Sequence, residues 1–480
     1  MPRWSATTAA MCALLLAAGC TPSAGPDASP TNTDRAFTDR PTSPEPTQAP
    51  ARPLGPPPWV DPPARQPLVL AVNARRPPID VTPRLARRIA AGKVDDWAAL
   101  DQVPGPLTVT RRVAGLRSLP EDVIAVVPAE SVGPEVRAVD VGGIDPLRTP
   151  GRYPLTTFAA AGPAEVTTLT VVGDVMLGRR VGERAAAEGD PAYALRPMQR
   201  RLAAADLTVG NLESTLSQDG SPTQGGDSFA ADPAVRAGLR DAGFDALGLA
   251  NNHVGDFGDR ALVQTVRRLR SAGLGPFGAG ATPAQARRPV VLERHGVRFG
   301  FLAFNAIGET PEVGPGRPGA VSVSMPPRTG PLDRRELDRF LRSVRRLDRR
   351  VDVLTVLPHW GTQYTQRPEP IQRAVAGELV AAGADLVVGG HPHWVQGASV
   401  RGKALVVHSL GNFVFDMDFM QQTQEGLVLE AVFWGDELKA AEFVPYRIGS
   451  DFAPRVVTPG AARANLDLFW QFSGIGASPR

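Results

Sequence analysis

Histidine, carboxylate and amide side chains recur directly after short apolar runs in this 480-residue chain. Asp174 follows the run LTVVG, His253 follows ALGLANN, and His391 follows LVVGG with His393 two residues later. Carboxylate oxygen and neutral imidazole nitrogen suit borderline divalent ions such as manganese, iron and zinc. The residue types therefore predict a divalent metal site that holds one or two ions.

Two ions would give such a site a definite chemistry. Paired metals about 3.5 to 4 Å apart can hold a phosphoryl group between them and lower the pKa of a bound water until it serves as a nucleophile. Further polar residues that follow apolar runs in the same way are Asn211, Glu213, Asn251, Asn252, His359 and His408.

The apolar runs that carry these residues read as strands separated by helical segments. A strand is expected from Leu169, and others at 207–209, 246–249, 299–304, 351–357, 386–388, 404–407 and 427–433. Leucine, phenylalanine and valine at helical spacing predict a helix across 337–347, and a second is expected across 371–379. The sum is a layered α/β domain, and in open α/β sheets groups at the carboxyl ends of strands meet in one crevice.

Six short motifs in this part of the chain together resemble those of a known family. They are GDVMLGR, NLE, NNHVGD, PHWG, GHPHW and SLGNF. Together they resemble the calcineurin-like metallophosphoesterases, and within them the poly-gamma-glutamate capsule synthesis proteins of the CapA type, over roughly residues 169–433. The resemblance implies a four-layer α/β/β/α sandwich with the metal site along one edge.

The resemblance also assigns roles to single residues. His253 would protonate the leaving oxygen, oriented by Asp256, and Arg179 would stabilise an anionic substrate. The metal ligands that it implies are Asp174 and His393 for the first ion, Asn211 or Glu213 for the bridging region, and Asn252, His359 and His391 for the second ion.

Two positions depart from the phosphoesterase pattern. Those enzymes usually carry Asp-x-His in the first motif, whereas Met176 stands two residues after Asp174 here. Their Gly-Asp bridging motif appears as Gly210 and Asn211. The site could therefore be mononuclear or altered in chemistry, with Glu213 supplying a carboxylate in compensation.

The amino-terminal residues predict export. Arg3 is followed by an apolar stretch and by LAAGC, which resembles a bacterial lipobox with Cys20 as the lipidated residue. Residues 1–20 would be a lipoprotein signal peptide, and the Pro-, Ser- and Thr-rich residues 21–67 a disordered tether. The chain is then expected to be extracytoplasmic and anchored to the cell membrane by lipid.

Three further segments complete the expected organisation. Residues 68–157 read as a small α/β domain that resembles one lobe of the phosphate-binding proteins of ABC importers, with docking or spacing as the favoured role and solute binding as the alternative. A CapA-like domain is expected at 166–450, followed by a tail at 451–480. A net charge of +3 and the lack of a basic stripe argue against a nucleic-acid partner.

The sequence leaves two functions open. The first is a metal-dependent hydrolase that acts on an anionic polymer or on an ester, phosphoester or amide of the cell envelope, with membrane proteins of capsule synthesis as partners. The second is a non-catalytic envelope protein with a degenerate metal site. Retention of His253 and Asp256 favours the first, and Met176 favours the second.

Overall fold

The structure is a computed structural model that describes residues 64–159, 165–217 and 219–476. The predicted signal peptide, the lipidation of Cys20 and most of the predicted tether lie outside these residues. Within the described part of the chain, no helix combines the length and the apolar character needed to cross a membrane.

The first large sheet joins parallel and antiparallel strands. Strands β8, β9, β10 and β11 run parallel, β20 pairs in parallel with β8, and β21, β22 and β23 continue the sheet in antiparallel fashion. Their bounds are β8 Val166–Val175, β9 Leu207–Leu212, β10 Ala246–Gly248, β11 Gly275–Phe277, β20 Asn412–Val414, β21 Glu425–Trp434, β22 Glu437–Ile448 and β23 Pro454–Val456.

The second large sheet has a parallel centre and antiparallel edges. The order is β13, β14, β16, β17, β19 and β18, with β13 and β18 antiparallel to their neighbours. The bounds are β13 Val290–Arg294, β14 Val297–Asn305, β16 Val353–His359, β17 Leu386–Val388, β18 Val395–Arg401 and β19 Ala404–Leu410. A short pair, β12 Ala279–Gly280 and β15 Gly319–Ala320, lies apart from both sheets.

Side chains alternate between the two faces of the second sheet. In β14, Phe299 and Phe301 point into the cluster shared with the first sheet, whereas Leu302 and Phe304 join the cluster beneath two helices. Those helices are α7, Arg334–Asp348, and α8, Pro370–Ala381. The apolar face predicted for α7 is buried: Leu337, Phe340, Leu341, Val344 and Leu347.

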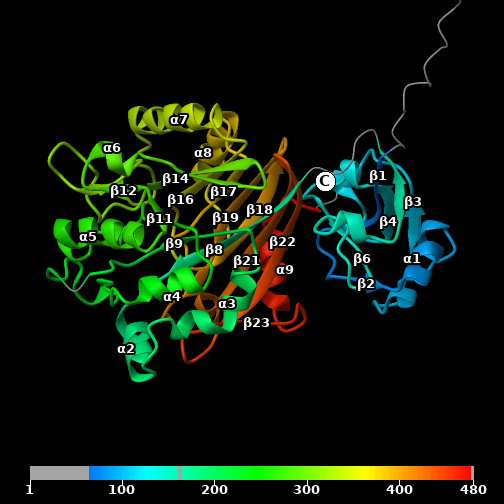
Figure 1. Ribbon diagram of the computed structural model, residues 1–480, viewed down its shortest axis with the longest axis horizontal. Helices are drawn as coiled ribbons and strands as arrows, with labels where there is room; N and C mark the ends of the chain where they lie inside the picture. The colour runs from blue at the N-terminus through cyan, green and yellow to red at the C-terminus, as the bar shows by residue number, and fades with distance from the viewer. Residues whose placement is uncertain (1–63, 160–164, 218, 477–480) are drawn as a thin grey trace, which may run out of the picture. The chain divides into compact units, whose positions relative to one another are not determined.

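Helices also cover the outer face of the first sheet, which gives the α/β/β/α layering (Figure 1). Their bounds are α2 Arg179–Ala187, α3 Arg196–Leu202, α4 Val235–Asp241 and α5 Gly258–Ser271, and the one-turn helix α6 spans Pro283–Ala286. Met198 of α3, Leu239 of α4 and Leu262 of α5 are buried in the main hydrophobic core. The fold is α/β with two mixed sheets, as expected of a metallophosphoesterase-like domain.

A smaller sheet forms from the residues before 159. Strands β3, β4, β1 and β5 pair in that order, β7 adds to β1, β2 pairs with β6, and helix α1 lies alongside. The bounds are β1 Arg65–Asn73, β2 Asp80–Val81, α1 Pro83–Ala90, β3 Thr108–Thr110, β4 Val123–Pro128, β5 Val136–Ala138, β6 Asp140–Val141 and β7 Thr156–Phe158. Strand β1 begins at Arg65, three residues before the expected boundary at 68.

The smaller sheet packs against β21 and β22. Trp434 Nε1 donates a hydrogen bond to the Leu147 carbonyl at 2.7 Å, and Arg148 pairs with Glu430 at 2.8 Å. Val69 and Ala71 of β1 share a buried cluster with Val432 and Trp434. The segment therefore contributes to the core of the larger sheet.

The residues after 450, expected to be a tail, also pack on the domain. Helix α9, Arg463–Gln471, places Phe469 4.7 Å from the ring of Phe443, measured between centroids. Beyond it, Ser473 Oγ accepts the backbone N–H of Ala398 at 2.9 Å. The ordered domain thus extends at least through Ser473.

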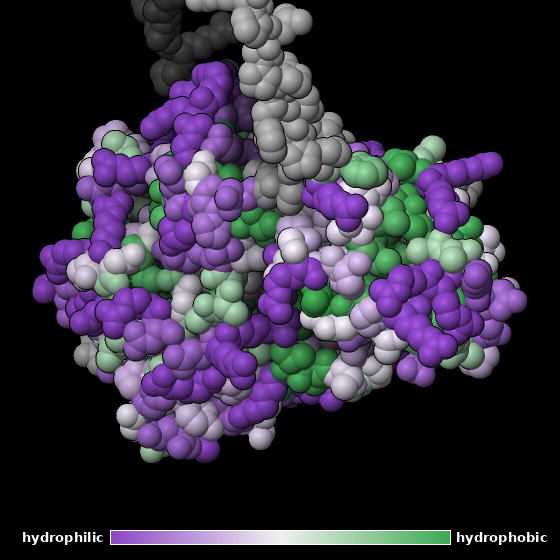
Figure 2. Space-filling model, turned by 45° about the vertical axis from the view of Figure 1, so that its right-hand side comes forward, coloured by the Kyte–Doolittle hydropathy of each residue, from purple (hydrophilic) through white to green (hydrophobic). Residues whose placement is uncertain are grey.

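Polar side chains dominate the face of the molecule that Figure 2 shows. In Figure 2, hydrophilic residues cover most of the face shown, and hydrophobic residues gather in separate patches. The exposed large hydrophobic residues of the described chain are Val103, Val113, Phe158, Val291, Phe419, Met420 and Val456.

Candidate metal centre

The site forms where the parallel strands of both sheets end. In the register of the first sheet, Asp174 on β8 lies between Asn211 on β9 and Asn412 on β20. In the second sheet His359 is the last residue of β16 and pairs with Asn305 of β14. The loops after β10 and β17 supply Asn252 and His253, and His391 and His393. The strand ends thus meet along one edge, as the sequence predicts.

Glu213 is the most exceptional residue of this edge. It is fully buried, yet neither carboxylate oxygen has a hydrogen-bond partner among the described residues. Its Oε1 lies 3.5 Å from His359 Nε2 and 3.8 Å from His253 Nε2. A buried carboxylate without partners is costly, and a bound cation is the usual compensation.

Two sets of ligand atoms converge on Glu213. Glu213, His359 and His391 form one group and Asp174, Glu213 and His393 the other, and within each group the potential ligand atoms all lie within 4.8 Å of one another. Both ring nitrogens of His391 also lack a partner within the described structure. Glu213 belongs to both groups, which is the position that a bridging carboxylate would need.

Asn211 is held differently from Glu213. Its Oδ1 accepts from Asn251 Nδ2 at 2.9 Å, and its Nδ2 donates to Asp174 Oδ1 at 2.8 Å and faces His359 Nδ1 at 3.2 Å. Asn251 is fixed in turn, because its Oδ1 accepts the backbone N–H groups of His253 and Val254. In this arrangement Asn211 presents its amide hydrogens to the site and Glu213 presents the free oxygens.

Two amides also contact the ring of His359. Asn211 Nδ2 lies 3.2 Å from His359 Nδ1, and His359 Nε2 lies 2.9 Å from Asn252 Oδ1. The backbone N–H of His391 donates to Asp174 Oδ2 at 3.0 Å, which fixes the second carboxylate oxygen. Asp174, Asn252 and His359 are thereby locked by neighbours before any ion binds.

His391 and His393 lie in a strained turn. Their φ angles are 93° and 57°, a region that residues other than glycine rarely adopt and that clusters at functional sites. His393 Nδ1 lies 2.8 Å from Asn412 Oδ1, and Asn412 Nδ2 donates to the Thr423 carbonyl at 3.0 Å. Asn412 therefore accepts the Nδ1 proton of His393 and leaves Nε2 as the nitrogen with a lone pair.

Burial dominates the electrostatics of the site. Desolvation raises the pKa of the carboxyl groups of Asp174 and Glu213 to about 7; the charge of Glu213 adds to the shift of Asp174, and the charge of Asp256 adds to the shift of Glu213. Desolvation likewise lowers the pKa of His359 to about 4 and of His393 to about 3, and takes that of His391 well below its usual range. A cation site requires neutral imidazoles and deprotonated carboxylates, so an ion that binds here would displace any proton held by Asp174 or Glu213.

His253 faces the same edge with a carboxylate behind it. Its Nδ1 lies 2.8 Å from Asp256 Oδ2, its backbone N–H is fixed by Asn251, and its ring stacks on Phe229 with centroids 3.8 Å apart. Burial lowers the pKa of His253, but the Asp256 hydrogen bond and the charges of Glu213 and Asp256 outweigh it, so the net shift is upward. The protonated ring is thus favoured.

Arg179 also contacts the ring of Phe229. Its guanidinium carbon sits 4.5 Å from the Phe229 ring centre, while Nε and Nη2 bind the two carboxylate oxygens of Asp416. A third nitrogen, Nη1, reaches Asp227 Oδ1 at 3.4 Å. The guanidinium group of Arg179, which was predicted to bind an anionic substrate, is paired with Asp416 instead. Arg179 therefore lies beside the site as part of an ion pair.

Met176 and His408 occupy structural positions. Met176, which replaces the expected histidine, is buried and its sulfur accepts the backbone N–H of Gly178 at 3.1 Å. His408 stacks on Trp360 outside the group around Glu213, and its carbonyl accepts from Trp360 Nε1 at 3.1 Å. Trp360 thus packs behind the site.

Sequence reasoning did not assign site roles to Asn251, Asn412, Phe229 and Glu309. Asn251 and Asn412 stand in quoted motifs, and the signal for them was their position directly after a strand. Glu309 binds Asn252 from a connection with no periodic pattern, so only the fold reveals it.

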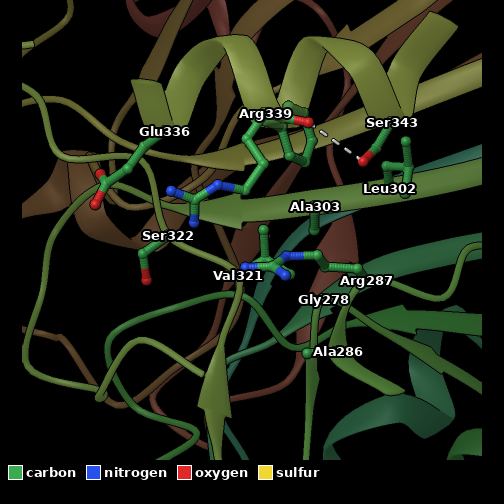
Figure 3. Close-up of a pocket in the computed structure, with 11 residues that line it drawn as sticks. Gly278, Ala286, Arg287, Leu302, Ala303, Val321, Ser322, Glu336, Arg339 and Ser343 are labelled. Carbon is green, nitrogen blue, oxygen red and sulfur yellow. Dashed lines mark hydrogen bonds between the residues drawn. The ribbon is translucent and has the colours of Figure 1, made fainter. Parts of the chain in front are cut away.

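A separate cavity lies beneath α7 and was not predicted to be a site. It encloses about 20 Å³ between β14, the end of α6 and α7, with Arg287, Glu336 and Arg339 among its lining residues (Figure 3). That volume holds about one water. The cavity shares no lining residue with the metal centre and has no room for a substrate.

Comparison with known proteins decides the family. The model of the bacterial capsule synthesis protein family, PGA_cap, matches residues 168–417, which include all the residues of the candidate metal centre. The chain belongs to this family. The matched span begins in β8 and ends just after β20, so it contains the strand ends that carry Asp174, Glu213, His359 and His391.

Two Bacillus proteins of the capsule family illustrate the similarity. Capsule biosynthesis protein CapA of Bacillus anthracis is 33% identical over 279 residues, which cover 55% of this chain and 63% of that protein. PGA biosynthesis protein CapA of Bacillus subtilis is 28% identical, over 55% of this chain and 67% of that protein. The chain thus spans less than two thirds of the Bacillus anthracis relative.

A third relative comes from outside the genus Bacillus. A probable polyglutamine synthesis accessory protein of Mycobacterium tuberculosis is 29% identical over 54% of this chain and 77% of that protein. Each of the three similarities covers little more than half of this chain.

Proposed function

We propose that this protein is a metal-dependent hydrolase that acts as an accessory in capsule or polyglutamate synthesis. The observation that carries the proposal is the convergence of Asp174, Glu213, His359, His391 and His393, with the oxygens of Glu213 and the nitrogens of His391 left without partners in the described structure. The unpartnered atoms of Glu213 and His391 would otherwise be buried at a cost in free energy, and a divalent cation would satisfy both side chains together.

The donor set fits one or two borderline divalent ions such as manganese, iron or zinc. When bound, such ions polarise a substrate oxygen and make a water molecule acidic enough to attack. Asp174 and His393 would hold the first ion, His359, His391 and Asn252 the second, and Glu213 would lie between them. Asn211, which presents amide hydrogens here, orients Asp174 and His359.

His253 supplies the proton for the leaving group. The hydrogen bond from Nδ1 to Asp256 leaves Nε2 pointing toward Glu213 and the metal ligands. The upward shift of the pKa of His253 favours a second proton at Nε2, the proton that a departing oxygen or nitrogen would take. Stacking on Phe229 holds the ring in that orientation.

The names of the relatives support an anionic polymer of the cell envelope as the substrate, such as polyglutamate, or an ester, phosphoester or amide bound to it. Cys20 and the sequence before it support export and lipid anchoring, which would place the site outside the cytoplasm near membrane proteins of capsule synthesis. The proposed substrate, the export and the lipid anchor rest on the sequence and on similarity to relatives.

The first test is metal content together with turnover. The purified protein is dialysed with Mn²⁺ or Zn²⁺, analysed by elemental mass spectrometry and assayed with bis(p-nitrophenyl) phosphate. Bound metal in the wild type that is reduced in His391→Ala and retained in the control His295→Ala supports the metal centre, because His295 is exposed and contacts Val166 instead. Metal without turnover, or no metal in folded protein, would favour the non-catalytic alternative that Met176 suggests.

A further inference from the structure

The loop that carries Asn252 and His253 is held from outside by the connection between β14 and α7. Two consecutive residues of that connection reach it. Glu309 Oε2 accepts Asn252 Nδ2 at 2.8 Å, and Thr310 Oγ1 accepts the backbone N–H of Gly255 at 3.1 Å. The connection therefore contacts the side chain of one predicted ligand and the backbone near the predicted acid.

Glu309 is kept in an unfavourable backbone conformation. Its φ angle is 63°, directly after Gly308 at 85°, and a residue with a side chain adopts this region only when its surroundings enforce it. The Thr310 N–H closes a tight turn onto the Gly308 carbonyl at 2.7 Å, and Asn305 Nδ2 donates to the same carbonyl at 2.8 Å. This turn aims the Glu309 side chain at Asn252.

Arg328 completes the arrangement from the other end of the same connection. Its Nη2 donates to Glu309 Oε1 at 2.6 Å, while Glu309 Oε2 accepts the hydrogen bond from Asn252 Nδ2. The pair is partly exposed, with 44% of the Arg328 side chain and 30% of the Glu309 side chain accessible to solvent. Both oxygens of the carboxylate are thus engaged, which restricts its rotation.

A carboxylate at this position dictates which way the Asn252 amide points. An ionised carboxylate can only accept, so Asn252 must turn its NH₂ group toward Glu309. Its Oδ1 then faces inward to His359 Nε2 at 2.9 Å, among the ligand atoms. The opposite rotamer would direct two N–H donors at that position, where a cation would be repelled.

We propose that Glu309, fixed by Arg328, is a positioning residue that turns the oxygen of Asn252 toward the metal ion. The inference rests on the proposed metal centre and assigns a role outside the ligand set. Without Glu309 the amide samples both orientations, and the ion loses a preorganised oxygen.

The test measures Mn²⁺ affinity by calorimetry in full-length wild type and variants, with the unfolding temperature of each metal-free protein alongside. Glu309→Ala is expected to weaken binding about 10-fold or more, the range found for outer-shell partners of metal ligands. Glu309→Gln keeps a carbonyl oxygen for Asn252 and should restore part of the affinity. Glu312→Ala is the matched control, because Glu312 lies in the same connection but pairs with Arg339.

The outcomes separate this inference from the proposed function. If the wild type binds Mn²⁺ and Glu309→Ala and Glu309→Gln bind it equally well, the positioning role is wrong and the metal centre stands. If the folded wild type binds no Mn²⁺ or Zn²⁺, the metal centre fails and the inference fails with it. Should Glu309→Ala not fold, Arg328→Ala decides: a severalfold weaker affinity supports the role, and unchanged affinity overturns it.

Discussion

His253 Nδ1 lies 2.8 Å from Asp256 Oδ2, and the same carboxylate oxygen accepts the backbone N–H of Phe229 at 2.7 Å. Asp256 therefore joins the imidazole to the residue on which that imidazole stacks. One buried carboxylate sets the tautomer of the ring, raises its affinity for a proton and fixes its plane. Such an arrangement suits a proton donor better than a residue that only fills space.

The first prediction concerns this donor. We expect His253→Ala to lower turnover of diphenyl phosphate, whose phenolate leaving group needs a proton, at least about 100-fold, because a positioned acid typically contributes two to four orders of magnitude. Metal content by elemental mass spectrometry should remain close to that of the wild type. His295→Ala, on an exposed histidine, should change neither quantity. Equal turnover in the wild type and His253→Ala would count against the mechanism.

The second prediction concerns the charge of Asp140 on β6. Burial, with the like charges of Asp145, Glu442 and Asp80, raises the pKa of this carboxyl to about 7. The folded-state pKa thus lies above the unfolded value, about 4. The contribution of protonated Asp140 to the free energy of unfolding is fully present below the unfolded-state pKa. It is lost as the pH rises through the folded-state pKa.

The variant Asp140→Asn cannot ionise at this position, so it should not lose this stability as the pH rises. We expect its unfolding temperature to exceed that of the wild type at pH 8 by clearly more than at pH 5, measured in chelator so that bound metal does not contribute. Asp101→Asn, at an exposed position that ends a short helical turn, is the control. The same difference between variant and wild type at both pH values would show that Asp140 does not titrate in this range.

The third prediction tests the packing of α7. Phe340 is 5% exposed and lies 4.9 Å from the ring of Phe304, measured between centroids. Phe340→Ala should lower the free energy of unfolding by about 3–5 kcal/mol, the range for removing a buried aromatic ring. Arg342→Ala, on the exposed face of the same helix, should cost well under 1 kcal/mol. Denaturation in urea compares the two.

This helix also shows what the sequence could predict. The apolar spacing from Leu337 to Leu347 identified both the helix and its buried face, because burial against a sheet imposes that period. The seven strand segments expected after Leu169 correspond to β9, β10, β14, β16, β17, β19 and β21. Strands β18 and β22 were among those missed, and with them the extension through α9, because polar residues, glycine and proline interrupt their apolar residues.

The residues of the candidate site likewise separate into those that the sequence could predict and those that it could not. Residues directly after strands, such as Glu213 and His391, could be predicted because parallel strands bring their ends together. The partners of those residues could not, because they depend on contacts between distant segments. Arg179 meets Asp416 across 237 residues, and Asn252 meets Glu309 across 57. Sequence patterns report the elements, whereas these pairings follow from how the connections pack.

The last prediction concerns the space around Asp174. Gly390 lies where an added Cβ would stand 2.5 Å from Asp174 Oδ1 and 3.3 Å from His359 Nδ1. Both atoms already have fixed partners, so neither can move without breaking the hydrogen bonds of Asn211. Gly390→Ala should therefore displace the carboxylate and lower Mn²⁺ affinity about 10-fold, by calorimetry. Gly151→Ala, where a Cβ meets nothing within 4 Å, should leave it unchanged. Wild-type affinity in Gly390→Ala would mean that Asp174 does not need this position to bind the ion.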